Sequence, residues 1–233
     1  MQGMAVTRHP PLREQVASAI RRAIVNLEFT PGQLLVEREL CEMTEASRSS
    51  VREALRQLEA EGLLESHNGK GIYIKVLSPP EAAQVYEVRA ELEGLAARLF
   101  HERATDDDRA RLQTATSNLA VAVQQASDSR SILKAQEEFY RCLFEGARNP
   151  FLDRTVQTVQ VLVTQLRAHT LTVPGRAQAS LREFQTIARE MVEGTPETAR
   201  QAAVDHVRHA ATVMASARET SAVQPDRRTR TSG

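Results

Sequence analysis

The segment from Ser47 to Gly71, SRSSVREALRQLEAEGLLESHNGKG, limits the fold of this chain more than any other part of the sequence. Its arginines recur at every fourth position and therefore share one face of a helix: Arg48, Arg52 and Arg56. A neighbouring face is apolar and suited to packing: Val51, Leu55 and Leu58. Ser47 is a favourable N-cap and Gly62 a favourable stop. The pattern predicts a short helix that is anchored on one side and carries guanidinium groups on another, which is typical of a DNA-reading element.

The flanking residues predict a compact module around this helix. An amphipathic helix begins near Leu12 and ends before Pro31-Gly32, and a second short helix is expected over Val36 to Met43. Two short strands are expected at 63–66 and 72–75, joined by a hairpin tip around Asn68-Gly69. Two helices, a turn, the arginine helix and a two-stranded wing together form a winged helix-turn-helix.

The rest of the chain predicts only helices. Ser78-Pro79-Pro80 interrupts the pattern and is the expected domain boundary. Six helices are expected after it, forming an antiparallel bundle, so the fold class is mainly α. The predicted divisions are a DNA-binding domain over 1–77, an all-helical effector and dimerisation domain over 78–220, and a disordered tail over 221–233.

Composition limits the class of protein. Net charge is +0, and residues 1–78 hold ten Lys plus Arg and ten Asp plus Glu, so any DNA-binding surface must be a local patch. The two cysteines, Cys41 and Cys142, lie in helical patterns, which indicates reduced thiols in a cytoplasmic protein. No apolar run is long enough to span a membrane. No nucleophile–base pair or phosphate loop is present, so an enzyme is not expected.

Two stretches, LVEREL at 35–40 and SRSSVREALRQLEAEGL at 47–63, resemble the DNA-binding domain of the GntR family of bacterial transcription regulators. The second half resembles the all-helical effector domain of that family's FadR subgroup, called FCD. This second resemblance is carried by residues scattered over five helices: Val88, Arg89, Glu93, Phe139, Tyr140, Asn149, Pro150, Phe151, Leu152, Glu183, Ile187 and His206. It implies a protein that binds operator DNA and responds to a small-molecule effector.

The candidate DNA contacts lie on the arginine helix and the wing. Arg48 and Arg52 lie on the N-terminal part of the helix, which enters the major groove in helix-turn-helix proteins. A bidentate arginine–guanine pair is worth about 1–3 kcal/mol of discrimination per base pair. Hydroxyl groups of Ser47 and Ser49 can donate to phosphates. The resemblance adds further contacts: Arg38 and the wing tip at Asn68, Gly69 and Lys70. An arginine stripe can also be a solvated face, but the cap, the stop and the wing favour DNA.

The candidate effector site consists of polar residues at apolar positions of the second half. Arg89, Gln136, Tyr140 and His206 all fall on inward stripes, and buried polar groups need partners. Several such residues in one bundle favour a polar ligand pocket. Each has an alternative. Arg89 can pair with Glu93 at i+4, His206 can be a hydrogen-bonded core histidine, and Gln136 and Tyr140 can be ordinary packing.

The resemblance also implies a metal site, which this chain lacks in part. Many relatives hold a divalent metal with an Asp and three His, and the matching positions here are Gln136, Tyr140, Phe184 and His206. A single imidazole with an amide and a phenol is not a competent site, and His209 one turn away is not expected to restore it. The expected state is therefore metal-free, with Arg89 as anion anchor and Tyr140 and Phe184 making the pocket aromatic.

The sequence favours a homodimeric, ligand-responsive regulator, because one recognition helix reads only a half-site. Its expected effector is a small organic acid or a partly apolar acidic metabolite that relieves repression. The alternative is an architectural or effector-independent DNA-binding dimer whose helical domain only dimerises.

Overall fold

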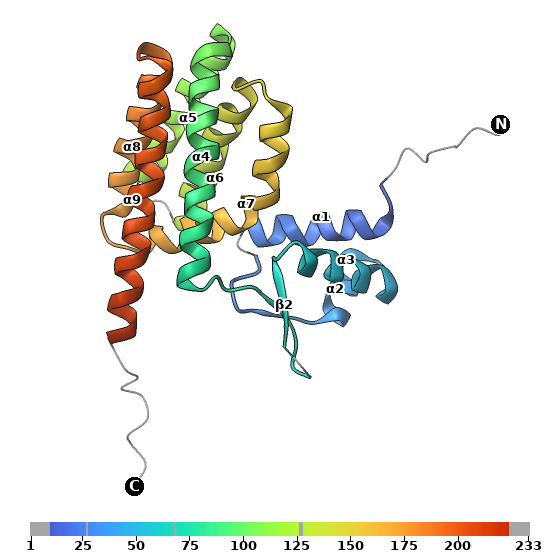
Figure 1. The fold of residues 1–233 in the computed structure, drawn as a ribbon. Helices are drawn as coiled ribbons and strands as arrows, with labels where there is room; N and C mark the ends of the chain where they lie inside the picture. Colours follow the sequence, from blue (N-terminus) through green and yellow to red (C-terminus); the bar gives the residue numbers. More distant parts are fainter. Residues whose placement is uncertain (1–9, 27, 68, 126–127, 224–233) are drawn as a thin grey trace, which may run out of the picture. The chain divides into compact units, whose positions relative to one another are not determined.

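The computed structural model describes residues 10–26, 28–67, 69–125 and 128–223. The chain divides into two compact units, Met1–Val76 and Leu77–Gly233 (Figure 1). The first unit combines helices with a small sheet, and the second is built from helices. The fold class predicted from the sequence is confirmed.

The first unit contains three helices: α1 Leu12–Val25, α2 Glu37–Thr44 and α3 Arg48–Ala60. Its strands are short: β1 Leu34–Leu35, β2 Leu64–His67 and β3 Gly71–Ile74. Figure 1 shows the β2–β3 hairpin extending from the group of three helices. This is the predicted winged helix-turn-helix.

The sheet has three strands in the described residues, where the sequence predicted two. β3 lies in the middle and pairs antiparallel with β2 and with β1, where Leu34 faces Tyr73 and Leu35 faces Ile72. A strand of two residues carries no readable alternation, so it could not be found from periodicity. The extra strand pairs the edge of the wing that would otherwise expose free backbone groups.

Helix α3 begins and ends with the predicted caps. The Ser47 hydroxyl accepts a hydrogen bond from the Ser50 amide at 3.3 Å. At the other end Gly62 takes φ +74°. The Gly62 amide donates to the Glu59 backbone carbonyl, and the Leu63 amide donates to the Leu58 backbone carbonyl. These two bonds form a Schellman ending, in which the left-handed residue is favourable for glycine. The cap and the stop fix which residues of α3 face outward.

The buried face of α3 packs onto a core shared with α1, α2 and the sheet. The side chains of this core are almost fully buried: Val16, Ala17, Ile20, Ile24, Leu35, Leu40, Val51, Ala54, Leu55, Leu58, Leu63, Leu64 and Ile74. Arg21 Nη2 donates to both carboxylate oxygens of Glu61, at 2.9 and 2.7 Å, and so joins α1 to the end of α3. The arginine face is thereby held on a rigid support.

The second unit contains six helices in the described residues, as expected: α4 Pro79–Arg103, α5 Asp106–Gln124, α6 Ser129–Gly146, α7 Pro150–Leu171, α8 Arg176–Glu193 and α9 Pro196–Val223. Capping boxes begin α4 at Ser78 and α5 at Thr105. Helix α9 runs three residues into the segment predicted as a disordered tail, and residues 224–233 lie outside the described residues.

Helices α4 and α9 lie side by side along their length and run in opposite directions (Figure 1). Phe100, Phe139 and Phe184 are fully buried at the centre of the bundle. Phe139 contacts Phe184 edge to face, with ring centroids 4.7 Å apart. Few aromatic residues are available, so alanine, leucine and valine fill much of the rest and let the helices pack closely.

Candidate functional site

The arginines of α3 lie on its solvent-exposed face. Arg48, Arg52 and Arg56 are exposed, as are Ser47 and Ser49. Ser47 already serves as the N-cap, and its hydroxyl also bonds the Ser49 hydroxyl at 2.9 Å. The N-terminus of α3 is exposed at Ser47, Arg48 and Ser49, and its free backbone amides together with the Arg48 guanidinium group favour an anion such as phosphate.

Other predicted DNA contacts lie on α2 and the wing. Arg38 on α2 is exposed and pairs loosely with Glu42 at 3.6 Å. Gly69 and Lys70 lie exposed at the hairpin tip, and the Tyr73 hydroxyl donates to the Lys70 carbonyl at 3.1 Å. Asn68 lies outside the described residues. The first unit thus presents a recognition helix and a wing in the arrangement of a DNA-binding domain.

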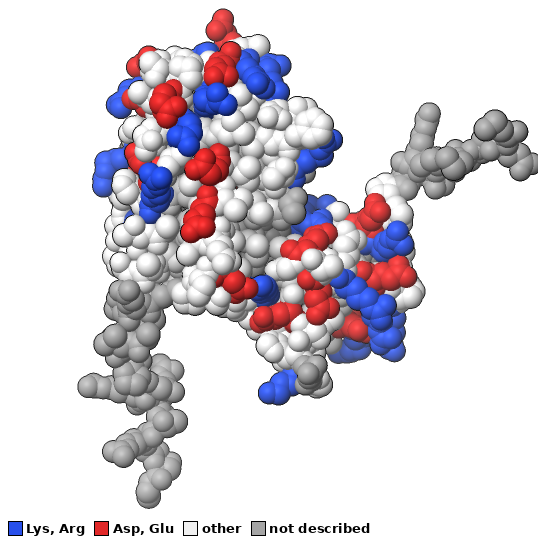
Figure 2. Space-filling model, in the orientation of Figure 1, with Lys and Arg blue, Asp and Glu red and all other residues white. Residues whose placement is uncertain are grey.

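Charge on this unit is mixed. On its visible face, Figure 2 shows basic and acidic side chains interspersed. Arg13 lies 3.8 Å from Glu53, and Arg52 pairs with Glu37. The unit therefore has no large one-signed surface on this face, and sequence-independent attraction to DNA is expected to be modest.

In the second unit, the candidate effector residue Arg89 lies in a buried ionic cluster. Its Nε donates to Glu93 Oε1 at 2.5 Å, and its Nη2 donates to the Tyr140 hydroxyl at 2.8 Å. The Tyr140 hydroxyl in turn donates to Glu93 Oε2 at 3.0 Å. Arg89 and Glu93 are only 2% and 3% exposed. The i+4 pair that the sequence offered as the alternative for Arg89 is therefore present.

A second guanidinium group from α7 joins this cluster. Arg167 is buried, its Nη2 donates to Glu93 Oε1 at 3.2 Å, and its Cζ lies 3.6 Å from the centre of the Tyr140 ring. Glu93 is thus shared by two arginines. One carboxylate cannot neutralise two guanidinium groups, so positive charge remains in the interior.

His206 lies in a neighbouring ionic group on α8 and α9. Its Nδ1 lies 2.6 Å from Glu183 Oε2, and both Nη atoms of Arg176 donate to Glu183 at 2.8 and 2.7 Å. His209 reaches the same carboxylate at 3.3 Å but is mainly exposed. His206 is therefore the hydrogen-bonded core histidine that the sequence offered as its alternative.

The pKa values of these groups follow from burial and from their partners. Burial alone would raise the pKa of Glu93 and lower that of Arg89, but their mutual attraction reverses both directions. Burial also opposes ionisation of Glu183, yet hydrogen bonds from His206 and Arg176 lower its pKa to about 2. Burial lowers the pKa of Arg167 below its ordinary value. It also lowers the pKa of His206, which favours the neutral imidazole.

Three buried polar atoms find no hydrogen-bond partner among the described residues and belong to side chains that line one cavity: Arg89 Nη1, Arg167 Nε and Gln136 Oε1. Further residues complete the lining: Thr170, Leu171, Arg176, Ser180, His206 and Ala210. The cavity has a volume of about 10 Å³, which is room for about one water molecule. The cavity therefore combines spare donors, a spare acceptor and excess positive charge.

The structure brings three of the five predicted effector residues to this cavity. Arg89, Gln136 and His206 line it, whereas Tyr140 and Phe184 lie behind it. Tyr140 is 5.5 Å from Phe184 between ring centroids, and Phe184 is 4.7 Å from the His206 ring. These two aromatic residues support the cluster from the core side.

Sequence reasoning did not predict that Arg167, Arg176 and Glu183 take part in these buried ionic groups. Arg167 follows Val163 by four residues on the inward stripe of α7, so a basic residue at an apolar position was the available signal. Arg176 and Glu183 are seven apart, and therefore on one face of α8. The pairing across helices could not be read from these spacings.

The residues present do not suit a divalent metal. The Tyr140 hydroxyl is bonded to Arg89 and Glu93, and His206 Nδ1 is bonded to Glu183. Among the residues that the structure describes, no three His, Cys, Asp or Glu side chains converge as metal ligands. Buried guanidinium groups would repel a cation at this point. The metal-free state stays a prediction.

Neutral His206 leads to a pH prediction. In the unfolded chain a histidine takes a proton near pH 6.5, whereas burial in the folded state disfavours that proton. The unfolded state therefore binds more protons, and the free energy of unfolding should fall as pH drops below about 6.5, by at most about 1.4 kcal/mol per pH unit. Urea unfolding at pH 7.5, 6.5 and 5.5 would measure this change in the free energy of unfolding.

The control for this prediction is the neighbouring exposed histidine. His206→Gln should remove the loss of stability between pH 6.5 and 5.5, whereas His209→Gln should retain it. Glu183, with its pKa lowered to about 2, contributes stability above its unfolded pKa near 4.5 that is lost only at lower pH. An unchanged pH profile in His206→Gln would show that His206 is not the group responsible.

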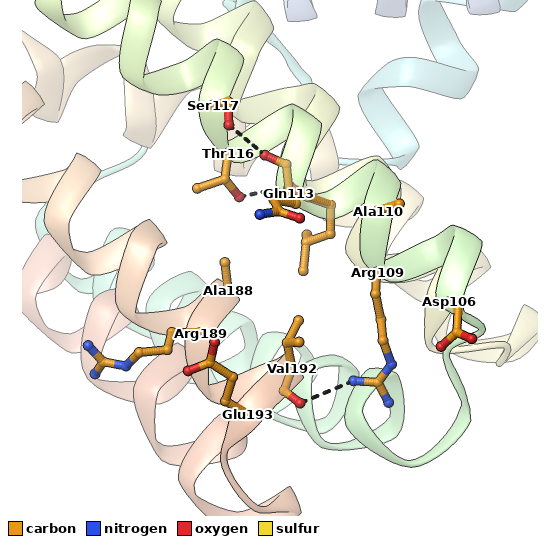
Figure 3. Close-up of a pocket in the computed structure, with 11 residues that line it drawn as sticks. Asp106, Arg109, Ala110, Gln113, Thr116, Ser117, Ala188, Arg189, Val192 and Glu193 are labelled. Atoms are coloured by element: carbon orange, nitrogen blue, oxygen red, sulfur yellow. Dashed lines mark hydrogen bonds between the residues drawn. The ribbon is translucent and has the colours of Figure 1, made fainter.

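A larger groove lies elsewhere, between α5 and α8, and encloses about 460 Å³ (Figure 3). Arg109 extends from α5 toward α8. Its guanidinium group donates to the backbone carbonyls of Met191 and Val192 at 3.2 and 3.4 Å, and to that of His101 at 3.1 Å. These bonds satisfy the carbonyl groups at the ends of two helices. Arg109 therefore has a structural role, and the groove is separate from the buried ionic cluster.

No helix in the described part of the chain is long and apolar enough to cross a membrane.

Comparison with known families agrees with both units. Residues 12–74 match the model for bacterial regulatory proteins of the gntR family, and residues 84–209 match the FCD domain. An HTH-type transcriptional regulator of Bacillus subtilis, YdhC, is 27% identical over 90% of this chain and 93% of that protein. A probable D-xylose utilization operon transcriptional repressor of Paenarthrobacter nicotinovorans is 28% identical over 84% of this chain and 87% of that protein.

Among solved structures, Escherichia coli McbR/YncC superposes with a TM-score of 0.77 at 19% identity, covering 90% of this chain and all of that one. This likeness concerns the fold. The recognition helix with its wing, the six-helix unit and the two family matches agree with one another. The chain therefore belongs to the GntR family of bacterial transcription regulators, and it combines that family's DNA-binding domain with an FCD domain.

Proposed function

We propose that this chain is a ligand-responsive repressor whose helical domain binds a small organic acid, or a partly apolar acidic metabolite, at the buried ionic cluster. The observation that carries the proposal is the unbalanced charge at Arg89, Arg167 and Glu93, together with the three unpartnered polar atoms. A bound carboxylate would supply the missing negative charge and accept from Arg89 Nη1 and Arg167 Nε. A hydroxyl group on the acid would donate to Gln136 Oε1.

Ligand entry would be coupled to a conformational change. The cavity has room for about one water, so an acid fits only in a conformation in which the surrounding side chains or helices have opened. A ligand that binds only the opened conformation shifts the population toward it. In a homodimer such a shift would change the placement of two DNA-binding domains and lower operator affinity.

The proposal predicts a measurable response to acids. Calorimetry on the full chain with a panel of carboxylates, with and without a hydroxyl group and an apolar chain, should find at least one that binds. The same acid should weaken operator binding by about 5- to 150-fold in fluorescence anisotropy, the usual range of allosteric coupling. Arg167→Met should reduce acid affinity at least about tenfold, because it removes the unbalanced cation while keeping a long apolar side chain.

The control is a second arginine of the same helix. Arg154→Met changes an exposed position near the start of α7 and should leave acid affinity as in the wild type. If Arg167→Met binds the acid as tightly as the wild type does, the proposed site is wrong.

The effector-independent DNA-binding dimer remains a second candidate, and one observation favours it. Arg89 and His206 already have internal carboxylate partners in Glu93 and Glu183. In that case the cluster only stabilises the bundle. If no acid in the panel binds and none changes operator affinity, this second candidate is supported and the first is overturned.

A further inference from the structure

An acidic residue of α2 is bound to the central arginine of the recognition helix. Arg52 Nε on α3 donates to both carboxylate oxygens of Glu37, at 3.1 and 2.8 Å. Glu37 is the first residue of α2, and its side chain is 35% exposed, whereas that of Arg52 is 58% exposed. Fifteen residues separate the two along the chain, so the helix-turn-helix fold itself brings them together.

The other candidate base-reading arginine differs from Arg52. Within the described residues, Arg48 forms no ion pair, so its side chain is not held in one orientation by a carboxylate. Arg38 pairs with Glu42 within α2, at a longer distance of 3.6 Å. Arg52 is therefore the candidate whose orientation is fixed by a different helix.

The contact uses one particular nitrogen of the guanidinium group. Glu37 accepts from Nε, which leaves the two terminal nitrogens, Nη1 and Nη2, as a further pair of donors. Guanine presents O6 and N7 as adjacent acceptors in the major groove, and two donors in a fixed fork can meet both. Fixing the side chain before DNA arrives also reduces the conformational entropy lost on binding.

We infer that Glu37 is a positioning residue for sequence recognition: it holds the Arg52 guanidinium group so that Nη1 and Nη2 together read a guanine. Glu37 acts through Arg52 and lowers general attraction to DNA, because a carboxylate near phosphates is repulsive. Its effect is therefore on discrimination between sequences. The inference rests on the proposed contact of Arg52 with a base.

A purely structural role makes a different prediction. If the pair only tied α2 to α3, Glu37→Ala would lower the unfolding midpoint and leave the base preference of the folded protein unchanged. Exposed ion pairs contribute little to stability, so we expect the midpoint to stay close to that of the wild type. The base preference is the quantity that separates the two roles.

The test uses the full chain and double-stranded DNA. Duplexes selected from a random library by the wild type define the operator, and single base-pair variants of that operator then give a discrimination ratio at each position. Arg52→Ala identifies the position that Arg52 reads. A bidentate arginine–guanine pair is worth about 5- to 150-fold in this ratio, the equivalent of about 1–3 kcal/mol.

Glu37→Ala should lower the ratio at that position by about fivefold or more and leave the ratios at other positions unchanged. Glu37→Gln should retain part of the ratio, because its amide oxygen can still accept from Nε. The matched control is Glu39→Ala, which removes the same charge from the first turn of the same helix at an exposed position. It should raise affinity for all duplexes slightly and leave every ratio unchanged.

Two results would overturn the inference, and they are distinguishable. If Arg52→Ala keeps the wild-type ratios, Arg52 does not read a base, and the proposed DNA contact fails together with the inference. If Arg52→Ala loses the ratio at one position while Glu37→Ala keeps it, the DNA contact stands and only the positioning role of Glu37 is wrong.

Discussion

Replacing Glu93 with alanine is expected to destabilise the helical unit by about 3–5 kcal/mol, the largest loss of stability expected from any substitution considered for this chain. The carboxylate is 3% exposed and accepts from Arg89, Arg167 and Tyr140. Without the Glu93 carboxylate, the guanidinium groups of Arg89 and Arg167 stay buried and lose the anion to which both donate. Urea or thermal unfolding followed by circular dichroism would measure the loss.

The same helix provides the control. Glu91 is two residues away, is 71% exposed and lies 3.3 Å from Arg200. Exposed pairs of this kind contribute about 0–1 kcal/mol, so Glu91→Ala should be nearly neutral. Arg167→Met should cost less than Glu93→Ala, because it removes the unbalanced charge. A loss below about 1 kcal/mol in Glu93→Ala would mean that the arginines are not held as charged groups in the core.

Arg52→Ala is expected to abolish operator recognition. In the proposed homodimer the same side chain would read both half-sites, so the expected loss of discrimination is about 2–6 kcal/mol in total, twice the value for one bidentate pair. Affinity for random duplexes should change much less, because such duplexes lose only about one charge of general attraction and no base-specific contact. The measurement is the ratio of dissociation constants for operator and random DNA at fixed salt.

Arg56 provides a comparison on the same helix. It lies one turn further along α3 and is exposed. Arg56→Ala should weaken binding to all sequences about equally. It should also reduce the slope of log binding constant against log salt concentration by about one, as expected for the loss of one phosphate contact. If Arg52→Ala instead weakens binding to all sequences equally and keeps the preference for the operator, the prediction that Arg52 contacts a base is wrong.

Local sequence signals were sufficient to predict the helices of both units. Ser47 and Gly62 bound α3 because capping depends on residues within one turn. Helical periodicity located all six helices of the second unit for the same reason. Strand β1 was missed because two residues carry no periodicity, and its formation depends on pairing with a segment nearly forty residues away.

The sequence by itself therefore determined the helices, including the recognition helix, the two strands of the wing hairpin and the presence of polar residues on inward faces. It also offered the Arg89–Glu93 pair, since residues four apart on a helix are neighbours. Only the tertiary structure decided the charge balance of the cluster, because Arg167 reaches Glu93 from α7 and His206 reaches Glu183 from α9. It likewise decided that Glu37 meets Arg52. Contacts between helices depend on how their faces pack, which no spacing within one helix records.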